Sequence, residues 1–316
     1  DRDRSIIISK FYSREIQKKI NNKKFDYILI HQCSLVSYLK TRIPIIIWTD
    51  LTFDLYQRNY FKNFKSYFSQ SKTNGNKLEI LALKKAKKII YTSSYTKLNA
   101  INKYKIKPSK IKVLPFGSNI DVNLKDKQRQ IILNKRINSK KKVIRFLSVG
   151  GDWYRKGMDT SIDVVRELRN MGFKCKIDIV GEKEPHNYLK PDFVKTHGFL
   201  NRNKLIEKKK LVSLFKESHF FILLSRAEAF GIVFNDAASY CLPSIAKNIG
   251  GIKSLIKNNA GILIPENTSN VKIAERISRI LFNDNTYKKM SLSTYKQYKA
   301  NSHWDQIAIQ LKKSFY

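Results

Sequence analysis

The sequence predicts an α/β protein with two domains, each a parallel sheet of doubly wound topology. Short apolar runs typical of buried strands alternate with helical patterns along the chain. A polar, charged segment at residues 121–142 separates two such series and is predicted to be a linker. The length of 316 residues suits two domains of ordinary size.

The first domain is predicted to cover residues 1–138. Asp26–His31 and Ile45–Asp50 are its clearest strands, and each ends in a polar side chain. A histidine at a strand end, such as His31, is often only structural. Ser69–Lys77 is polar and predicted to be a loop.

The second domain is predicted to cover residues 141–296. Its expected strands are Val143–Val149, Lys176–Gly181, Phe193–Gly198, His219–Leu224, Pro243–Ala246 and Gly261–Ile264. Helices are expected at Asp159–Met171 and Ile232–Leu242. Residues 297–316 continue an amphipathic pattern that includes Trp304 and predict a C-terminal helix.

Two carboxylates follow the predicted strand His219–Leu224. Glu228 lies in the loop after it, and Asp236 lies eight residues later, in the next helix. Ligands of an open α/β sheet bind outside the carboxyl ends of the strands. Two carboxylates there can accept hydrogen bonds from neighbouring hydroxyls of a sugar or a ribose. The alternative is a loop acid and an exposed helix acid without a ligand.

Two further loops carry groups suited to an anion. Arg155 and Lys156 follow the strand Val143–Val149, and both side chains bind phosphate well. Gly250 and Gly251 precede a helix expected to begin near Ile252, whose N–H groups would attract an anion. An anion site beside a polyol site suits a nucleotide-sugar. A solvated Arg–Lys pair and a simple glycine turn are the alternatives.

The chain resembles the retaining GT-B glycosyltransferases known as group 1 or family 4. The resemblance rests on Lys112–Asn119, Phe146–Gly157, Ile179–Glu182, His197–Leu200 and Ser225–Gly251. It implies two Rossmann-like domains that face a cleft, with the last helix crossing back to the first domain. It also implies transfer of a hexose-type sugar from a nucleotide-diphosphate sugar to a glycan, lipid or small-molecule acceptor, without a metal or other cofactor.

The resemblance also implies roles for single residues. Glu228 is expected to hold hydroxyls of the donor sugar as a catalytic residue, with His31 near the reacting sugar. Asp236 is expected to bind the ribose, and Asp50 to line the acceptor side. The remaining expected donor-binding residues are Gly151, Arg155, Lys156, Phe230, Gly231, Gly250 and Gly251.

The sequence departs from the family pattern in several places. The second acid is Asp236 where Glu is usual, Gly151 stands where Arg is more common, and Ala229 replaces a glycine. No strand with a glycine-rich loop precedes Ile6, so we expect the first domain to lack its first βα units. The alternative functions are therefore a catalytically impaired GT-B relative that binds nucleotide or a partner and, with less support, a nucleotide-sugar epimerase.

The formal net charge is +37. Residues 1–140 hold 31 Lys and Arg against nine Asp and Glu, a net charge of +22, so the excess favours the first domain. An anionic membrane surface, nucleic acid or an AT-rich coding bias would each explain it. Tyr56–Phe68 alternates basic and aromatic residues, and we hypothesise weak peripheral membrane binding through it. A specific nucleic-acid partner is not expected, because the charge is diffuse.

The expected location is the cytoplasm, peripheral at the inner face of the membrane if that hypothesis holds. The sequence contains no window typical of a transmembrane span or a secretory signal. The three cysteines, Cys33, Cys175 and Cys241, are isolated in apolar surroundings, which indicates reduced thiols.

Overall fold

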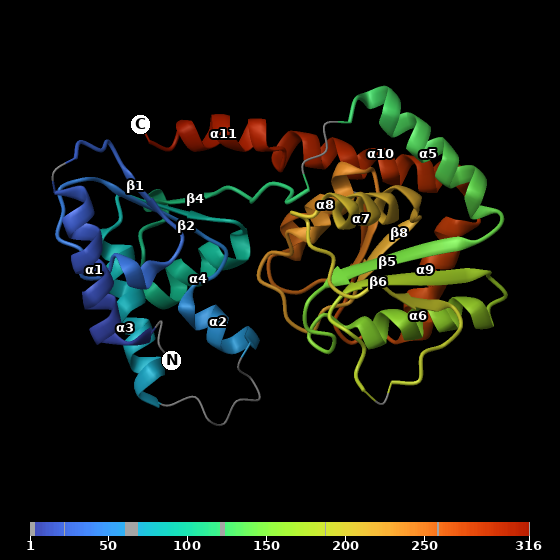
Figure 1. Ribbon diagram of the computed structural model, residues 1–316, viewed down its shortest axis with the longest axis horizontal. Coiled ribbons are helices and arrows are strands. Elements are labelled where there is room, and N and C mark those ends of the chain that lie inside the picture. The colour runs from blue at the N-terminus through green and yellow to red at the C-terminus, as the bar shows by residue number, and fades with distance from the viewer. Residues whose placement is uncertain are drawn as a thin grey trace. The chain divides into compact units, whose positions relative to one another are not determined.

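The computed structural model describes residues 4–21, 23–60, 69–120, 124–186, 188–257 and 259–315. The chain divides into two compact units (Figure 1). Unit 1 comprises Asp1–Pro115 and Ile307–Tyr316, and unit 2 comprises Phe116–Gln306. Of the predicted membrane-binding segment, Tyr56–Tyr60 lies in a helix, whereas Lys62, Phe64, Lys65, Tyr67 and Phe68 lie outside the described residues.

Unit 1 contains a four-stranded parallel sheet in the order β1-β2-β3-β4. Its strands are β1 (Ile28–Ile30), β2 (Ile45–Thr49), β3 (Lys88–Tyr91) and β4 (Ile111–Val113). Every residue of β2 is buried, as expected for a central strand between two parallel neighbours. His31 and Asp50 directly follow β1 and β2, so both lie at the carboxyl edge of this sheet.

The helices of unit 1 are α1 (Ile6–Ile20), α2 (Phe53–Tyr60), α3 (Ser69–Lys85) and α4 (Ser94–Tyr104). The prediction of a polar loop at Ser69–Lys77 was wrong, because these residues form the first turns of α3. The buried positions of α3 are Gly75, Leu78, Glu79, Ala82 and Leu83, which recur with helical spacing. The apolar residues of this stripe begin at Leu78. The first half of α3 is polar, so its sequence shows no helical periodicity of apolar residues.

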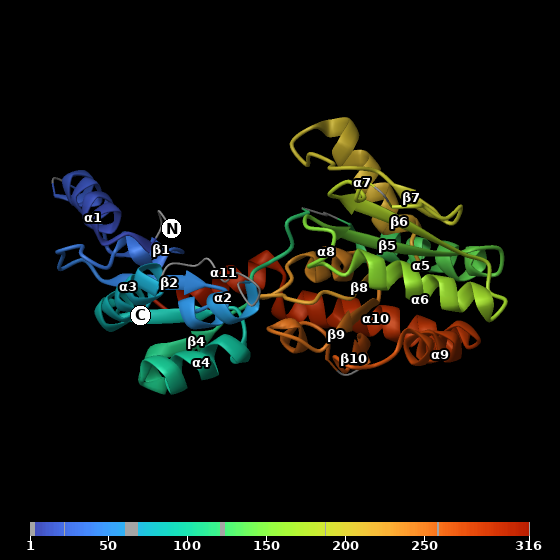
Figure 2. The same cartoon turned by 90° about the horizontal axis from the view of Figure 1, so that it is seen from below.

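Unit 2 contains a six-stranded parallel sheet in the order β10-β9-β8-β5-β6-β7, which Figure 2 shows from β7 at one edge to β10 at the other. Its strands are β5 (Ile144–Gly150), β6 (Cys175–Gly181), β7 (Val194–Thr196), β8 (Phe220–Leu223), β9 (Ser244–Lys247) and β10 (Gly261–Ile264). The chain runs outward from β5 to β7 and then returns to the other side of β5 with β8. The strand order therefore reverses between β5 and β8, which is the topological switch point of this sheet.

Helices cover both faces of this sheet (Figure 1). The elements are α5 (Asp126–Lys140), α6 (Met158–Asn170), α7 (Leu205–Glu217), α8 (Val233–Ser239), α9 (Asn270–Leu281) and α10 (Asp284–Asn301). Helices α6 and α9 pack together on one face, while α10 packs against α5 and α8 on the other. The two parallel sheets confirm the predicted α/β class with two Rossmann-like sheets.

The predicted linker at 121–142 contains α5, and this helix belongs to unit 2. Its buried Arg136 donates to the carbonyls of Phe215, Lys216, Tyr240 and Cys241, which fixes the helix to the unit. The division between the units thus falls at Pro115, earlier than the boundary near residue 138 that the charged composition suggested.

The C-terminal residues form two helices, α10 and α11 (Trp304–Lys312), with a break at Ser302–His303. Trp304 Nε1 donates to Ser118 O at 2.7 Å within unit 2. Ile307–Tyr316 groups with unit 1, where Lys112 Nζ donates to Ser314 Oγ at 2.8 Å. Within the described part of the chain, no helix has both the length and the apolar character needed to cross a membrane. All three cysteines are buried thiols.

Candidate functional site

The loops after β5 and β8 meet at the switch point of unit 2. Gly157, which ends the first loop, has a φ of +63°. A side chain at this position would collide with Leu224 O, at the start of the second loop. A glycine is therefore needed where the two backbones approach, and it lets α6 begin directly beneath the second loop.

Lys156 and Glu228 form an ion pair between these two loops. Lys156 Nζ lies 2.6 Å from Glu228 Oε2, and both side chains are largely buried. Ser225 Oγ donates to the same carboxylate oxygen at 3.3 Å. Two charges that are taken out of water cost free energy unless each keeps a close partner, and here each is the partner of the other. The structure thus brings together two residues that were predicted separately.

Arg155 is more exposed than Lys156 and lies beside the pair. Its Nε donates to Asp152 Oδ2 at 2.8 Å, and its Nη1 lies 3.4 Å from Ala227 O. The guanidinium is thus held near the loop that carries Glu228 while remaining accessible. Gly151, in the same loop, is exposed.

Arg226 was not predicted, and it fastens the two loops to each other. Its Nη1 and Nη2 donate to the two carboxylate oxygens of Asp159 at 2.8 and 2.7 Å, and Nη1 also donates to Tyr154 O. Its backbone N–H donates to Arg155 O at 2.7 Å. Burial pushes the pKa of Asp159 upward, but the bonds and charge of Arg226, together with backbone hydrogen bonds at Thr160 and Asp159, hold the pKa below its ordinary value.

Glu182 was also missed. It directly follows β6, and its Oε2 accepts a hydrogen bond from the backbone N–H of Trp153 at 2.7 Å. This contact fixes the middle of the loop that carries Arg155 and Lys156. Two sequence signals pointed to it: a carboxylate directly after a strand of the same sheet, and its place in Ile179–Glu182, one of the segments that resemble the family.

The glycine pair packs against the Glu228 loop. Gly250 has a φ of +51°, and a side chain there would collide with Glu228 O. The Gly251 N–H donates to Ala229 O at 2.9 Å. The helix predicted near Ile252 is only the three-residue 3₁₀ turn η4 (Ile252–Ser254). The glycines therefore support the backbone of the loop, and the helix dipole invoked for anion binding is absent from this turn.

Phe230 and Gly231 complete the turn into α8. Phe230 is buried and lies edge-on to Phe116, with ring centroids 6.0 Å apart. Gly231 follows it with a φ of +82°. The structure thus places Phe230 in packing between two loops of unit 2.

Asp236 is buried on α8 and holds the backbone of residues 118–120. Its Oδ1 accepts hydrogen bonds from Ser118 Oγ at 2.7 Å, Asn119 N at 2.7 Å and Ile120 N at 3.2 Å. Burial raises the pKa of Asp236, and these bonds oppose that rise. The neighbouring Asn235 Nδ2 donates to Phe116 O at 2.7 Å. The acid predicted to bind a ribose thus already holds a segment of its own chain through one oxygen.

His31 and Asp50 lie in unit 1 and the Glu228 group lies in unit 2. His31 is exposed, and its Nδ1 lies 2.9 Å from Trp48 O. Asp50 is half-buried, and its backbone oxygen accepts a hydrogen bond from Thr96 Oγ1 at 2.6 Å. These two residues follow neighbouring parallel strands, so they lie at the same edge of the sheet.

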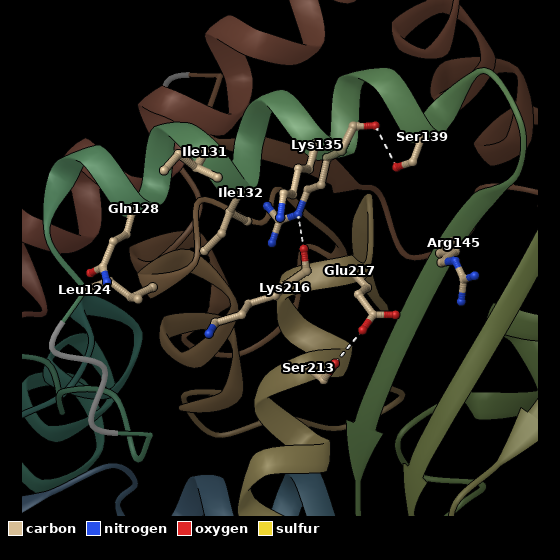
Figure 3. Close-up of a pocket in the computed structure, with 11 residues that line it drawn as sticks. Leu124, Gln128, Ile131, Ile132, Lys135, Ser139, Arg145, Ser213, Lys216 and Glu217 are labelled. Atoms are coloured by element: carbon tan, nitrogen blue, oxygen red, sulfur yellow. Dashed lines mark hydrogen bonds between the residues drawn. The ribbon is translucent and has the colours of Figure 1, made fainter.

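A cavity of about 580 Å³ in unit 2 holds none of the predicted site residues (Figure 3). It lies between α5, α7 and the start of β5, the end of that strand opposite to the Lys156 loop. Its lining residues are Leu124, Gln128, Ile131, Ile132, Lys135, Arg136, Ser139, Arg145, Ser213, Lys216 and Glu217. Arg136 Nε donates to Lys216 O at 2.9 Å. Ser213 Oγ donates to Glu217 Oε1 (Figure 3).

The family model described as "Glycosyl transferases group 1" matches residues 129–297. An uncharacterized glycosyltransferase of Methanocaldococcus jannaschii is 24% identical over 199 residues, 62% of this chain and 55% of the relative. The match thus spans about half the length of that curated relative.

Solved structures with similar folds include a glycosyltransferase of Rickettsia africae ESF-5, with 17% identity, a TM-score of 0.68, and coverage of 98% of this chain and 81% of that one. Sucrose-phosphate synthase of Thermosynechococcus elongatus has 17% identity, a TM-score of 0.72, and coverage of 98% and 78%. HepE of Anabaena in complex with UDP-glucose has 16% identity, a TM-score of 0.68, and coverage of 96% and 81%. At such identities the likeness concerns the fold.

Proposed function

The chain belongs to the glycosyl transferases group 1 family, and from this premise we propose that it transfers a sugar from a nucleotide-diphosphate sugar to an acceptor. One observation carries the proposal: the ion pair between Lys156 and Glu228 at the switch point of unit 2. A cation suited to phosphate and a carboxylate suited to hydroxyls stand next to each other, as the two halves of such a donor require. The UDP-glucose complex of the similar HepE structure supports a nucleotide-sugar as the donor class.

In the proposed donor complex, Lys156 exchanges part of its contact with Glu228 for the diphosphate. Glu228 then accepts hydrogen bonds from hydroxyls of the sugar, and Arg155 adds a second cation to the phosphate side. Charge-assisted hydrogen bonds of this kind are about twice as strong as neutral ones. The pair keeps both groups oriented until the donor arrives, which limits the reorganisation that binding requires.

The proposed transfer retains the configuration of the sugar and uses no metal. The bond from the anomeric carbon to the diphosphate oxygen breaks, and the acceptor oxygen bonds to the same face of the sugar. The acceptor proton passes to the departing diphosphate, whose charge Lys156 and Arg155 stabilise. His31 and Asp50 of unit 1 are assigned to the reacting sugar and the acceptor.

The acceptor is proposed to be a glycan, a lipid-linked sugar or a small molecule, met in the cytoplasm at the inner face of a membrane. The net charge of +22 in residues 1–140 supports an anionic surface as a partner. Flotation with anionic vesicles at low ionic strength tests this part of the proposal. A protein that stays unbound under those conditions contradicts the membrane association and leaves the donor site unaffected.

A second candidate is a relative that binds nucleotide without transferring sugar. Two observations favour it: Asp236 uses Oδ1 to hold Ser118–Ile120, and the Gly251 N–H donates to Ala229 O. Both groups were expected to face the donor.

A thermal-shift panel with UDP, GDP, ADP and their sugars distinguishes the candidates, because a ligand that binds the folded state raises the unfolding midpoint. A transferase is expected to respond to one nucleotide and more strongly to its sugar, and to release the nucleotide when acceptor is added. The Glu228→Gln variant should respond equally to the nucleotide and its sugar. A response to nucleotide without any turnover favours the second candidate, and no response to any ligand contradicts both.

A further inference from the structure

A second pocket, in unit 1, is built almost entirely from lysine. Its volume is about 480 Å³, and it lies between the C-terminal end of α3 and the connection from α4 to β4. The lining residues are Lys84, Lys87, Lys105, Ile106, Lys107, Ser109 and Lys110. A concave surface focuses the field of its charges more than a flat or convex one does.

The segment that forms this pocket carries no acidic residue. Residues 80–120 contain ten lysines and no Asp or Glu. Across the part of the chain that the structure describes, none of the five pocket lysines forms an ion pair. Ammonium groups around one hollow repel each other, and an anion that enters relieves this repulsion.

The frame that carries the lysines is rigid. Lys110 Nζ donates to Leu83 O at 2.9 Å and to Lys84 O at 2.8 Å, which ties the loop to the end of α3. Ile106, in the connection from α4 to β4, is buried in the core of unit 1 and anchors this connection. Pro108 opens the 3₁₀ turn η3 (Pro108–Lys110), which restricts the backbone further. The backbone positions that carry the lysines are therefore fixed around the hollow before a ligand arrives.

Helix ends explain only part of this cluster. Cations are favoured at helix C-termini, which accounts for Lys84, Lys105 and Lys110 at the ends of α3 and α4. Lys87 precedes β3, and Lys107 is the N-cap residue of η3, a position at the positive end of that turn where a cation is not favoured. The pocket thus holds more positive charge than its helices require.

The pocket is separate from the residues assigned to the acceptor. It lies before Lys88 and Ile111, the first residues of β3 and β4. His31 and Asp50 follow the last residues of β1 and β2. Because the four strands are parallel, the two groups occupy opposite edges of the same sheet.

We propose that the Lys84–Lys110 pocket binds a phosphate group, as a second anion site that does not take part in transfer. Four exposed ammonium groups around a rigid hollow provide strong, compact donors for phosphate oxygens. The phosphate belongs either to the headgroup of an anionic lipid or to a soluble phosphate compound. The inference does not depend on the proposed transferase activity.

The test uses two triple variants of the full chain with the same change in charge. The pocket variant is Lys84→Gln/Lys105→Gln/Lys107→Gln, which leaves the anchoring Lys110 intact. The control is Lys19→Gln/Lys72→Gln/Lys77→Gln, three exposed lysines on α1 and α3 of unit 1. Binding of a soluble phosphate is measured at low salt by calorimetric titration with inorganic pyrophosphate. Binding of a lipid headgroup is measured at low salt by sedimentation with phosphatidylcholine vesicles, with and without phosphatidylglycerol.

We expect the pocket variant to bind at least one probe roughly tenfold more weakly than the control. A difference with pyrophosphate identifies a soluble phosphate, and a difference only with phosphatidylglycerol vesicles identifies a lipid headgroup. Pyrophosphate also fits the donor loop, but that loop is the same in both variants and cancels in the comparison. Equal weakening in both variants, or no binding of either probe by the wild type, overturns the proposal. Equal thermal midpoints verify that both variants are folded.

Discussion

Two buried acids of unit 2 differ in what satisfies them. Glu228 faces a lysine side chain on a neighbouring loop, whereas Asp236 accepts from a hydroxyl and two backbone N–H groups of residues 118–120. A lysine side chain can turn to another anion, but a backbone N–H stays where the fold holds it. Glu228 can therefore exchange its partner for a substrate, whereas the hydrogen bonds of Asp236 stabilise the fold.

The largest expected effect is that of Glu228→Gln on turnover. The amide keeps the shape but loses the charge, so we expect turnover to fall by roughly a thousandfold with nucleotide affinity nearly unchanged. Steady-state kinetics and nucleotide titration measure the two quantities, with Glu275→Gln on the exposed face of α9 as the matched control. Equal losses of turnover and nucleotide affinity would place Glu228 elsewhere than on the sugar.

Asp236→Ala should act on stability. It leaves Asn119 N without its acceptor, whereas Ser118 Oγ still donates to Ile120 O and Ile120 N still donates to Ser118 Oγ. We therefore expect the free energy of unfolding to fall by about 2 kcal/mol. Chemical denaturation measures this, with the exposed Asp192→Ala as control. If stability is unchanged while nucleotide affinity drops, Asp236 binds the ribose, which contradicts a mainly structural role.

Glu79 adds a third buried acid, in unit 1, and it extends the comparison. Burial raises its pKa to about 7, and hydrogen bonds with Cys33 and Phe53 only partly oppose this. Because the pKa in the folded state lies above its unfolded value near 4.5, the folded state binds the proton more tightly. Stability from this group is therefore present below pH 4.5 and is lost as the pH rises to about 7.

The ionisation of Glu79 should lower the free energy of unfolding by about 3 kcal/mol. Unfolding measured at pH 5 and pH 8 should show the decrease in the wild type and a much smaller one in Glu79→Gln, which cannot ionise. An identical pH dependence in both proteins would mean that the carboxyl is neutralised by a partner, as Glu228 is.

The smallest expected effect is that of Arg226→Lys. Lysine cannot reproduce the bidentate contact with Asp159, so the Lys156 loop and the Glu228 loop should lose their fixed spacing. We expect donor affinity to weaken by about 1 kcal/mol, measured by titration with the nucleotide-sugar. Arg166→Lys, in the exposed ion pair with Asp163 on α6, serves as control. An equal loss of donor affinity in this control would mean that Arg226 has no specific role in the site.

The fold was largely predictable because each buried strand is an apolar run bounded by polar loops. Gly261–Ile264 was predicted with its observed bounds, and β8 and β9 were each placed within one residue. The group 1 family was also recognised correctly, from the loops that follow these strands. Ser69–Lys77 failed because its apolar stripe lies in the second half of α3.

The partners of the site residues were not predictable. Asp236 meets Ser118 across 118 residues of chain, and Lys156 meets Glu228 across 72. The contact between Lys156 and Glu228 follows from the strand order, which places β8 beside β5. Arg226 gave no signal, because an arginine in a lysine-rich chain is ordinary and only the structure shows the bidentate contact with Asp159.

The most direct test of the central claim is the affinity of the preferred nucleoside diphosphate for the wild type, Lys156→Ala and the exposed control Lys174→Ala. The exchangeable pair predicts binding about tenfold weaker in Lys156→Ala and unchanged in the control, since one charge-assisted contact to phosphate is lost. Equal affinity in all three proteins would contradict the claim that Lys156 turns from Glu228 to the donor diphosphate.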